Sequence, residues 1–379
     1  MSAVRSPVTR IPRQPLLAAA LALLCGTSLS AHAQATPEVV AKNLDHPWGI
    51  TFIGNGRMLV TERSGRMRVV QPNGDLGAPL EGLPKVDVGG QGGLLDVQAD
   101  SGFARNRTVY FCYSEPAASG GGNSTALASA RLADDEKRLE QVKVIFSQKP
   151  KYRSDAHFGC RIVENGDGTL FLTLGDRFRR MDDAQKLDNH HGKIVRINKD
   201  GSIPKDNPFV GRSGALPEIW SYGHRNAQGA TLGPDGKLWE NEHGPQGGDE
   251  INRLEAGKNY GWPVISYGEH YGGGKVGEGS SKPGMEQPLH DWTPSIAPSG
   301  MAFLKSDKYG KEWKGSLFVG ALKFRYLARL EVRDGKVVKE EKLLQEFGKR
   351  IRDVREGPDG LLYLLTDEGD GKVVRLRPR

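Results

Sequence analysis

The sequence predicts an all-β protein, a six-bladed β-propeller of four-stranded antiparallel blades that forms a single domain. Glycine supplies 50 of the 379 residues, roughly twice its usual share, which indicates many turns between short strands. Six stretches repeat one pattern, in which an apolar strand, a turn and a second apolar strand follow one another. No stretch is typical of a long helix.

The six repeats extend along the chain in order. Four of them carry Asn-Gly or Asp-Gly in the turn, at Gly56, Gly168, Gly236 and Gly360, and this pair between apolar strands is a strong hairpin signal. Two β-sandwiches are the alternative, but they would not explain six similar units, whereas a propeller repeats one unit radially. The paired strands are expected at residues 48–52 and 58–62, 93–97 and 109–113, 158–163 and 170–176, 228–232 and 238–242, 299–303 and 316–323, and 351–354 and 362–367.

Residues 1–33 have the pattern of an export signal peptide. Three arginines precede the apolar run 16–24, and Ala31-His32-Ala33 is a small-x-small cleavage site. A membrane anchor is the alternative, but this run is too short to span a bilayer comfortably, and no later segment approaches ~20 apolar residues. We therefore expect cleavage near Ala33, a propeller domain at 34–379, a periplasmic location and no membrane-spanning segment.

The net charge limits which partners the protein can bind, and the cysteines offer one disulfide. The net charge is +7, with 53 basic and 46 acidic residues, and loss of the three leader arginines reduces the excess to four. No basic run is interleaved with aromatic residues, so nucleic-acid binding is not expected. Cys112 and Cys160 both lie in apolar, strand-like stretches. An exported protein could join them, and two buried free thiols remain equally open.

Polar residues that follow the apolar strands should meet at one mouth of the propeller channel. His157 suits a general base because its pKa lies near neutrality, although a lone histidine is more often structural. The several cations favour an anionic partner with carboxylates or phosphates, with solvated salt bridges as the alternative. The expected channel-mouth residues are Gln91, His157, Asp176, Arg225, Asn226, Glu242, Lys323, Arg350 and Arg352.

The segment 243–252 has the composition of a calcium-binding loop. Its glycines and Pro245 expose backbone carbonyl groups, and Asp249 and Glu250 add hard oxygen ligands, the mixture that calcium prefers. No histidine and cysteine cluster has zinc-ligand spacing. No glycine turn leads from a strand into a helix, so a nicotinamide cofactor is disfavoured.

At these residues the chain resembles the soluble pyrroloquinoline quinone (PQQ)-dependent aldose sugar dehydrogenases, a family of quinoproteins similar to soluble glucose dehydrogenase. The resemblance covers about residues 38–378, and its motifs occur in the family's order. The matching segments are Asp45-His46-Pro47-Trp48, residues 90–96, His157-Phe158-Gly159, residues 218–223 with Arg225-Asn226, residues 241–245, 248–252, 259–263 and 320–323, and Arg350-Ile351-Arg352-Asp353-Val354.

The resemblance implies an oxidoreductase that converts aldoses to lactones. By it, His157 takes the proton of the anomeric hydroxyl, hydride passes from the sugar carbon to C5 of PQQ, and Arg225 stabilises the developing negative charge. PQQ carries three carboxylates, which agrees with the cationic mouth. The residues that match cofactor-binding positions are Gln91, Arg225, Asn226, Tyr271, Lys323, Arg350 and Arg352.

The resemblance also implies two calcium ions. The carbonyl oxygens of Gly244 and Pro245 match ligands of an ion that bridges to PQQ and polarises it. Glu250 and the carbonyl of Tyr260 match a second, structural site. The expected partners are an aldose and an external electron acceptor, either a quinone or a small redox protein, and the expected assembly is a monomer or homodimer.

Two departures from soluble glucose dehydrogenase bear on specificity. Ala156 stands where that enzyme has an acid, and Arg177 stands where it has a glutamine near the sugar. We therefore expect a broader or different range of aldoses or alcohols. Two other functions compete, namely a calcium-dependent propeller lactonase or related hydrolase, which the mainly cationic mouth disfavours, and a non-catalytic sugar-binding propeller, which would need neither His157 nor the cations.

Overall fold

The fold is a ring of six antiparallel sheets, as the repeats predict. The computed structural model describes residues 1, 2 and 35–379. Five of the sheets have four strands and one has three. The helical segments of this part of the chain are α1 (Phe103–Asn106) and the short 3₁₀ helices at Met181–Gln185 and Gln345–Phe347.

The strands follow one another blade by blade. The sheets consist of β2 (Pro47–Phe52), β3 (Met58–Glu62) and β4 (Arg66–Val70); β5 (Leu94–Ala99), β6 (Thr108–Pro116), β7 (Asn123–Leu132) and β8 (Leu139–Ser147); β9 (Gly159–Glu164), β10 (Thr169–Leu174), β11 (Lys193–Asn198) and β12 (Ile219–Tyr222); β13 (Ala227–Leu232), β14 (Leu238–Glu242), β15 (Asp249–Leu254) and β16 (His290–Trp292); β17 (Pro298–Phe303), β18 (Leu317–Ala321), β19 (Leu327–Arg333) and β20 (Lys336–Leu343); and β21 (Ile351–Glu356), β22 (Leu362–Thr366), β23 (Gly371–Pro378) and β1 (Ala35–Leu44).

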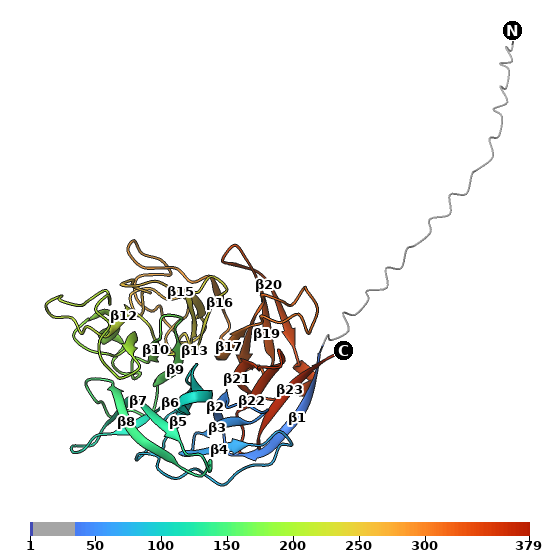
Figure 1. Cartoon of the computed structure of the whole chain (residues 1–379). Helices are drawn as coiled ribbons and strands as arrows, with labels where there is room; N and C mark the ends of the chain where they lie inside the picture. The colour runs from blue at the N-terminus through green and yellow to red at the C-terminus, as the bar shows by residue number, and fades with distance from the viewer. Residues whose placement is uncertain (3–34) are drawn as a thin grey trace. The chain divides into compact units, whose positions relative to one another are not determined.

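The six predicted hairpins are the two inner strands of the six blades. The innermost strands β2, β5, β9, β13, β17 and β21 each contact the next one, and β21 contacts β2, so that they close a ring (Figure 1). The ring is completed by β1, which pairs antiparallel with β23 from Ala35 opposite Pro378 to Leu44 opposite Gly371. One blade therefore takes strands from both ends of the domain.

The first blade departs from the predicted four strands. Its sheet ends at β4, and the following segment makes a single bridge between Val70 and Leu76. That segment runs beside β4, with the amide nitrogens of Gly77 and Leu80 donating to Val69 and Met67 at 2.8 Å. Pro79 has no N–H to donate, so the segment cannot form a regular ladder.

Apolar side chains fill the spaces between neighbouring blades. One core cluster joins Trp48 and Leu95 to residues of β6, β7, β9 and β10. Within it Cys112 of β6 and Cys160 of β9 form a disulfide, with their Cα atoms 5.7 Å apart. Of the two alternatives that the sequence leaves open, the structure has the bridge, which links the second blade to the third.

A buried ionic network crosses the propeller axis. Nη1 of Arg161 lies 2.9 Å from Asp96 and 3.1 Å from Asp353, and Arg355 contacts the same two carboxylates at 2.8 and 3.1 Å. These side chains come from β5, β9 and β21. The two acids and two arginines balance in charge, as buried ions require. They occupy the centre of the ring beside the cavity described below, because Arg161 stacks on Trp48, which lines that cavity.

The predicted signal peptide at 1–33 lies outside the described residues, apart from residues 1 and 2. Within the described part of the chain, no helix is long and apolar enough to cross a membrane.

Candidate active site

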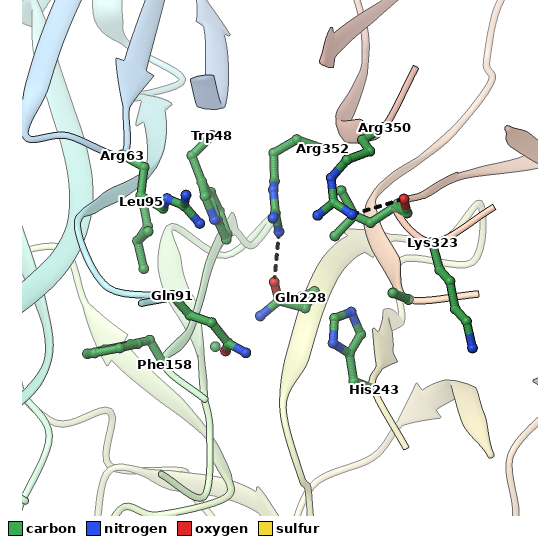
Figure 2. Close-up of a pocket in the computed structure, with 13 residues that line it drawn as sticks. Trp48, Arg63, Gln91, Leu95, Phe158, Gln228, His243, Lys323, Arg350 and Arg352 are labelled. Atoms are coloured by element: carbon green, nitrogen blue, oxygen red, sulfur yellow. Dashed lines mark hydrogen bonds between the residues drawn. The ribbon is translucent and has the colours of Figure 1, made fainter. Parts of the chain in front are cut away.

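All six inner strands contribute to one cavity of about 340 Å³ (Figure 2). Each inner strand, or the residue just before it, supplies one wall, as expected if equivalent strand ends converge. Four positions predicted to bind a cofactor lie together here, namely Gln91, Lys323, Arg350 and Arg352. The lining residues are Trp48, Arg63, Gln91, Leu95, Phe158, Gly159, Gln228, His243, Ala297, Leu322, Lys323, Arg350 and Arg352.

The cavity is strongly cationic. Arg63, Lys323, Arg350 and Arg352 line it, and Asp367 is the acid that pairs with Arg352 and Arg350, at 2.6 and 3.2 Å. Burial works against ionisation of Asp367, but the charge and hydrogen bond of Arg352, together with the charges of Arg350 and Arg63, outweigh it and lower the pKa of this carboxyl. Four cations against one carboxylate leave an excess of three positive charges, which suits a ligand with three carboxylates.

Several buried guanidinium nitrogens around the cavity have no partner. Among them are Nε of Arg352 and Nε of Arg225, and a buried donor without an acceptor is costly. The Nη1 atom of Arg352 donates to Gln228 at 3.1 Å, as Figure 2 shows. His243 adds no charge near neutral pH, because burial lowers its pKa to about 4. The donors present therefore fit a planar polyanion such as PQQ.

His157 is held by a buried carboxylate. Its Nδ1 atom lies 2.6 Å from Oδ1 of Asp176, and the indole nitrogen of Trp262 donates to Oδ2 of Asp176 at 2.8 Å. Asp176 is fully buried. It was expected to line the channel mouth; it lies behind His157 instead, because its oxygens are occupied by His157, Trp262 and the amide of Phe178.

The protonation states of this pair suit a base. Burial lowers the pKa of His157 below its ordinary value, although the Asp176 carboxylate acts in the opposite direction. Burial by itself would raise the pKa of Asp176, but the interactions with His157 and Arg225 outweigh it and lower that pKa. Near neutral pH the acid is therefore ionised and the imidazole is neutral. Since Nδ1 faces the carboxylate, Nε2 carries the free lone pair.

The backbone around His157 adopts a conformation that is rare for residues other than glycine. His157 has a φ of 53°, in the left-handed region, and lies two residues before the start of β9. A Cβ atom at Gly175 would collide with the carbonyl oxygen of His157, so only glycine fits there. The side chain of Gln91 accepts the amide proton of His157 at 2.9 Å. Asn226 accepts that of Gly159 at 3.2 Å. Asn226 is buried, so it supports the backbone and lies behind the cavity wall.

Arg225 is fixed beside the same pair. Its Nη1 atom donates to the carbonyls of His243 and Gly244 at 3.0 and 2.6 Å, and its amide donates to Glu242. Its guanidinium lies over the rings of Trp262 and Tyr271, at 5.2 and 5.9 Å from their centres. Trp262 thus contacts both Arg225 and Asp176. Glu242 was also expected at the mouth, but it is buried beneath Arg225.

The candidate calcium loop lines a second cavity, of about 720 Å³. Gly244, Pro245 and Tyr271 lie on its walls, together with Lys323 and His243, which also line the central cavity. Tyr271 is well exposed. Asp249 was expected to offer a ligand oxygen, but its carboxylate braces the loop by accepting from Gly244 N at 2.9 Å and from Ser295 and Ala297. The backbone carbonyls thus remain the candidate ligands.

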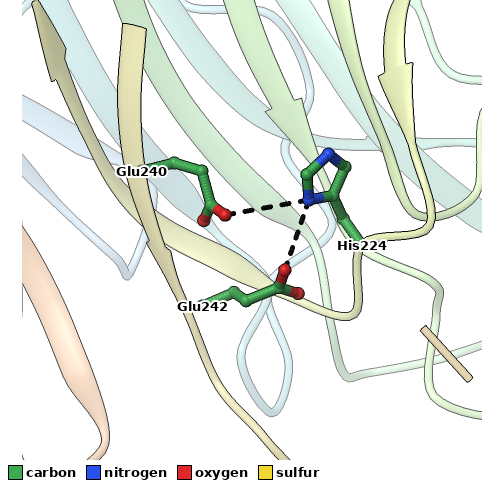
Figure 3. A group of neighbouring side chains, drawn as sticks. All are labelled: His224, Glu240 and Glu242. Atoms are coloured by element: carbon green, nitrogen blue, oxygen red, sulfur yellow. Dashed lines mark hydrogen bonds and ion pairs between the residues drawn. The ribbon is translucent and has the colours of Figure 1, made fainter. Parts of the chain in front are cut away.

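A buried cluster of acids lies behind this loop. Glu240 and Glu242 approach Nδ1 of His224 at 3.8 and 3.2 Å (Figure 3), and Glu250 lies opposite Glu242 in the ladder. Burial, and then the charge of Glu242, raises the pKa of both Glu240 and Glu250. Oε2 of Glu240 has no hydrogen-bond partner.

Glu242, Glu250 and Tyr260 border one small space there, of about 10 Å³. Two carboxylates that repel one another, with the unpartnered Oε2 of Glu240 on the neighbouring part of β14, fit an oxygen-coordinated cation. The predicted pair Glu250 and Tyr260 is therefore brought together.

Sequence reasoning missed several lining residues. Trp48, Arg63, Gln228 and His243 all line the central cavity. The repeat pattern could have found Arg63, which directly follows the second strand of the first unit, and His243, which holds the same place in the fourth.

Arg177, expected near a sugar, is buried instead. It donates to the carbonyls of Ser154 and Ala156 at 2.7 Å and to Asn123, and it lies over Phe158.

The chain is similar to known sugar dehydrogenases along its length. The model of the family described as Glucose / Sorbosone dehydrogenase matches residues 44–375. An aldose sugar dehydrogenase of Escherichia coli K12 is 45% identical over 371 residues, covering 97% of this chain and 99% of the relative. These matches confirm the resemblance to the aldose sugar dehydrogenases that the sequence motifs indicate.

Solved structures agree with this family and with the propeller fold. The crystal structure of the soluble aldose sugar dehydrogenase from Escherichia coli in the apo-form superposes with a TM-score of 0.88 at 45% identity, covering 91% of this chain and all of the other. The PQQ-bound form of an aldose sugar dehydrogenase from Streptomyces coelicolor has a TM-score of 0.75 at 26% identity, covering 92% and 99%.

Proposed function

Since the chain belongs to the glucose/sorbosone dehydrogenase family, we propose that it is a PQQ-dependent oxidoreductase that converts aldose sugars to lactones. The observation that carries this proposal is a neutral, buried His157 held by Asp176 beside a cavity with three excess positive charges. The PQQ-bound relative from Streptomyces coelicolor, which has the same fold, supports the cofactor.

The residues that would hold PQQ are those that line the central cavity. Lys323, Arg350 and Arg352 offer charge-assisted hydrogen bonds to its carboxylates, and Gln91 offers a neutral amide. Bound PQQ supplies a quinone that accepts a hydride from the sugar carbon. Asn226 and Tyr271 complete the proposed binding set, Asn226 through the backbone that it supports and Tyr271 at the rim.

His157 would act as the general base. With Nδ1 directed at Asp176, Nε2 takes the proton of the anomeric hydroxyl, and the carboxylate stabilises the imidazolium that forms. Trp262 and Phe178 hold the other hydrogen bonds of Asp176. The acid therefore keeps the imidazole in one tautomer and one orientation throughout the proton transfer.

Arg225 would provide a preorganised positive charge. Its contacts with His243, Gly244 and the ring of Trp262 fix the guanidinium before any ligand arrives. A cation fixed in this way stabilises negative charge that develops at a nearby oxygen without reorganisation during the reaction.

Two cation sites belong to the proposal. The carbonyls of Gly244 and Pro245 would hold a calcium ion next to the cofactor, since both residues line the cavity that adjoins the central one. Glu250 and the carbonyl of Tyr260 would hold a structural calcium, since both residues border one small space together with Glu242.

The cellular setting is part of the same proposal. Residues 1–33 would direct export to the periplasm, where residues 34–379 fold as the catalytic propeller and pass electrons to a quinone or a small redox protein. The disulfide between Cys112 and Cys160 supports an oxidising compartment.

A lactonase of the same fold is the weaker candidate. It needs calcium at the channel centre, where this chain has the four cations of the cavity and the charge-balanced network around Arg161. The acidic cluster lies instead on β14 and β15, behind the mouth.

Reconstitution of the purified protein with PQQ and calcium tests the proposal. We expect PQQ to bind with micromolar or tighter affinity, and aldoses to drive reduction of an artificial electron-accepting dye. Hydrolysis of lactones without dye reduction would favour the second candidate, and absence of PQQ binding would contradict the first.

A further inference from the structure

The backbone that leads from His157 into β9 is left-handed at three of four successive residues. His157, Gly159 and Cys160 have φ values of 53°, 66° and 81°. Glycine adopts such values freely, but a residue with a Cβ atom does so only at a cost in free energy. A conformation of this kind persists where the surrounding structure fixes it. The support of Cys160 therefore bears on the place of His157.

Cys160 is the first residue of a β-bulge. The ladder between β9 and β10 gains one residue on β9, between Gly159 and Ile162. Cys160 and Arg161 therefore stand together opposite Thr173, and the amide of Arg161 donates to Oγ1 of Thr173 at 2.9 Å. When the first residue of a bulge is left-handed, it is usually glycine. A cysteine thus occupies a position at which the backbone favours glycine.

Other blades carry the same bulge without the left-handed residue. The innermost strands β2, β5 and β17 each gain one residue at the same place in their ladders. The first bulge residues there are Trp48, Leu95 and Ser299, and none of these three has a positive φ. Of these four blades, the left-handed turn thus belongs to the one that carries His157.

Cys112 holds Cys160 from the neighbouring blade. The disulfide joins the first residue of the bulge to the middle of β6, and both cysteines are fully buried. They belong to the same core cluster as Phe158, which lines the central cavity. The hydroxyl of Thr125 also holds this segment, because it donates to the carbonyl of Phe158 at 2.6 Å. The covalent bond acts on the left-handed residue itself.

We propose that Cys160, held by its bond to Cys112, is a positioning residue for the base His157. The inference rests on the proposed function, in which Nε2 of His157 takes a proton. The bond keeps residue 160 left-handed, and this conformation sets the direction of the chain towards His157. When the bond is absent, a residue with a Cβ atom relaxes towards the extended conformation and moves the imidazole away from its place beside Asp176. A displacement of about 1 Å can lower a rate by about 10².

Two double variants separate positioning from stability. Cys112→Ala, Cys160→Ala removes the bond and leaves a residue that disfavours the left-handed region. Cys112→Ala, Cys160→Gly removes the same bond but leaves a residue that accepts this region. Both variants lose the stabilisation that the disulfide supplies. On the PQQ- and calcium-loaded protein we expect kcat of the alanine double variant to fall about tenfold, and kcat of the glycine double variant to stay within about twofold of the unchanged protein.

Hydrogen exchange at residues 157–160 gives a readout that needs neither cofactor nor turnover. The amides of His157 and Gly159 donate to Gln91 and Asn226 at 2.9 and 3.2 Å, so they exchange slowly while the backbone keeps its conformation. We expect faster exchange in the alanine double variant than in the glycine double variant and the unchanged protein. Val374→Ala, at a buried position of β23 in another blade, controls for lost stability and should change neither kcat nor exchange at these residues.

The outcomes distinguish the inference from the proposed function. An alanine double variant with the kcat and exchange of the unchanged protein overturns the inference, because the bond then serves stability alone. A glycine double variant as impaired as the alanine double variant overturns it too, since the left-handed conformation is then not what the bond supports. If the loaded, unchanged protein oxidises no aldose, the proposed function fails, whereas the exchange rates still test the hold of the disulfide on this backbone.

Discussion

Nδ1 of His157 and Oδ1 of Asp176 lie 2.6 Å apart in a part of the protein from which solvent is nearly excluded. His157 precedes β9, and Asp176 follows β10 of the same blade. One hairpin thus positions both the base and the acid that orients it. Trp262, from another blade, donates a hydrogen bond to the acid and holds it in place. This arrangement predicts how the reaction rate should depend on pH.

Replacement of Asp176 by Asn should slow the reaction and change its pH profile. The Asn side chain can donate to Nδ1, which leaves Nε2 protonated and unable to accept a proton, so kcat should fall by about 10²–10⁴. Asp176 raises the pKa of His157 against the effect of burial, so its loss lowers that pKa further. The acid limb of kcat/KM should therefore move to lower pH.

The pH–rate profile of the Asp176→Asn protein decides this point. PQQ affinity serves as the control for folding, because Asp176 lies behind His157 and lines none of the cavities described. An acid limb that moves to higher pH, or a kcat equal to that of the unchanged protein, would contradict the assigned role.

Lys323→Met should weaken PQQ binding by about 10–100-fold, the usual effect of losing a charge-assisted hydrogen bond. Lys323 is an exposed residue that lines both the central cavity and the calcium-loop cavity, so this change leaves no buried charge unpaired. Fluorescence titration with PQQ measures the affinity. Lys305→Met, at an exposed position away from both cavities, is the matched control and should bind PQQ normally.

Calcium should stabilise the protein through the acidic cluster. Ions that bind only the folded state raise its stability by mass action, so the thermal midpoint should rise with added calcium and fall with a chelator. Glu250→Gln should remove most of this response, whereas Glu81→Gln, an exposed glutamate outside the cluster, should preserve it. A thermal midpoint insensitive to calcium in the unchanged protein would argue against a cation at Glu250.

Reduction of the Cys112–Cys160 bridge should destabilise the domain. The two cysteines are separated by 48 residues. In the chain-entropy model, opening a loop of this length in the unfolded state lowers the free energy of unfolding by about 4 kcal/mol. The free energy of unfolding in denaturant should fall accordingly when a reductant is added. In a Cys112→Ala, Cys160→Ala double variant the reductant should not change the free energy of unfolding. A decrease in that variant would show that the reductant acts on stability by a route other than this disulfide.

Much of the fold could be predicted from the sequence, because each blade repeats its inner hairpin. The repeated strand–turn–strand pattern located all six hairpins, four of them by their turn signals, and the convergence of their ends brought Gln91, Lys323, Arg350 and Arg352 to one cavity. The three-stranded first blade was not predicted. The segment after β4 contains Pro79 and pairs only irregularly with β4, so it does not form a fourth strand. Whether a proline breaks the pairing depends on the register of the two strands, which the sequence does not show.

Side-chain direction was the main limit of sequence reasoning at the site. Arg177 follows Asp176 in the chain, and only the left-handed backbone at residues 177 and 178 turns the arginine inward and the phenylalanine outward. Asp176, Glu242 and Asp249 have the residue types of a channel mouth or a metal ligand, but each is occupied by neighbours from other strands or loops. Such long-range partners leave no local pattern.

The turnover of a His157→Ala variant tests the central claim most directly. The variant is loaded with PQQ and calcium, its cofactor content is measured, and aldose-driven dye reduction is compared with that of the unchanged protein. We predict normal PQQ content and a kcat lower by at least about 10², the usual contribution of a general base. Normal PQQ content with undiminished turnover would contradict the assignment of His157 as the base.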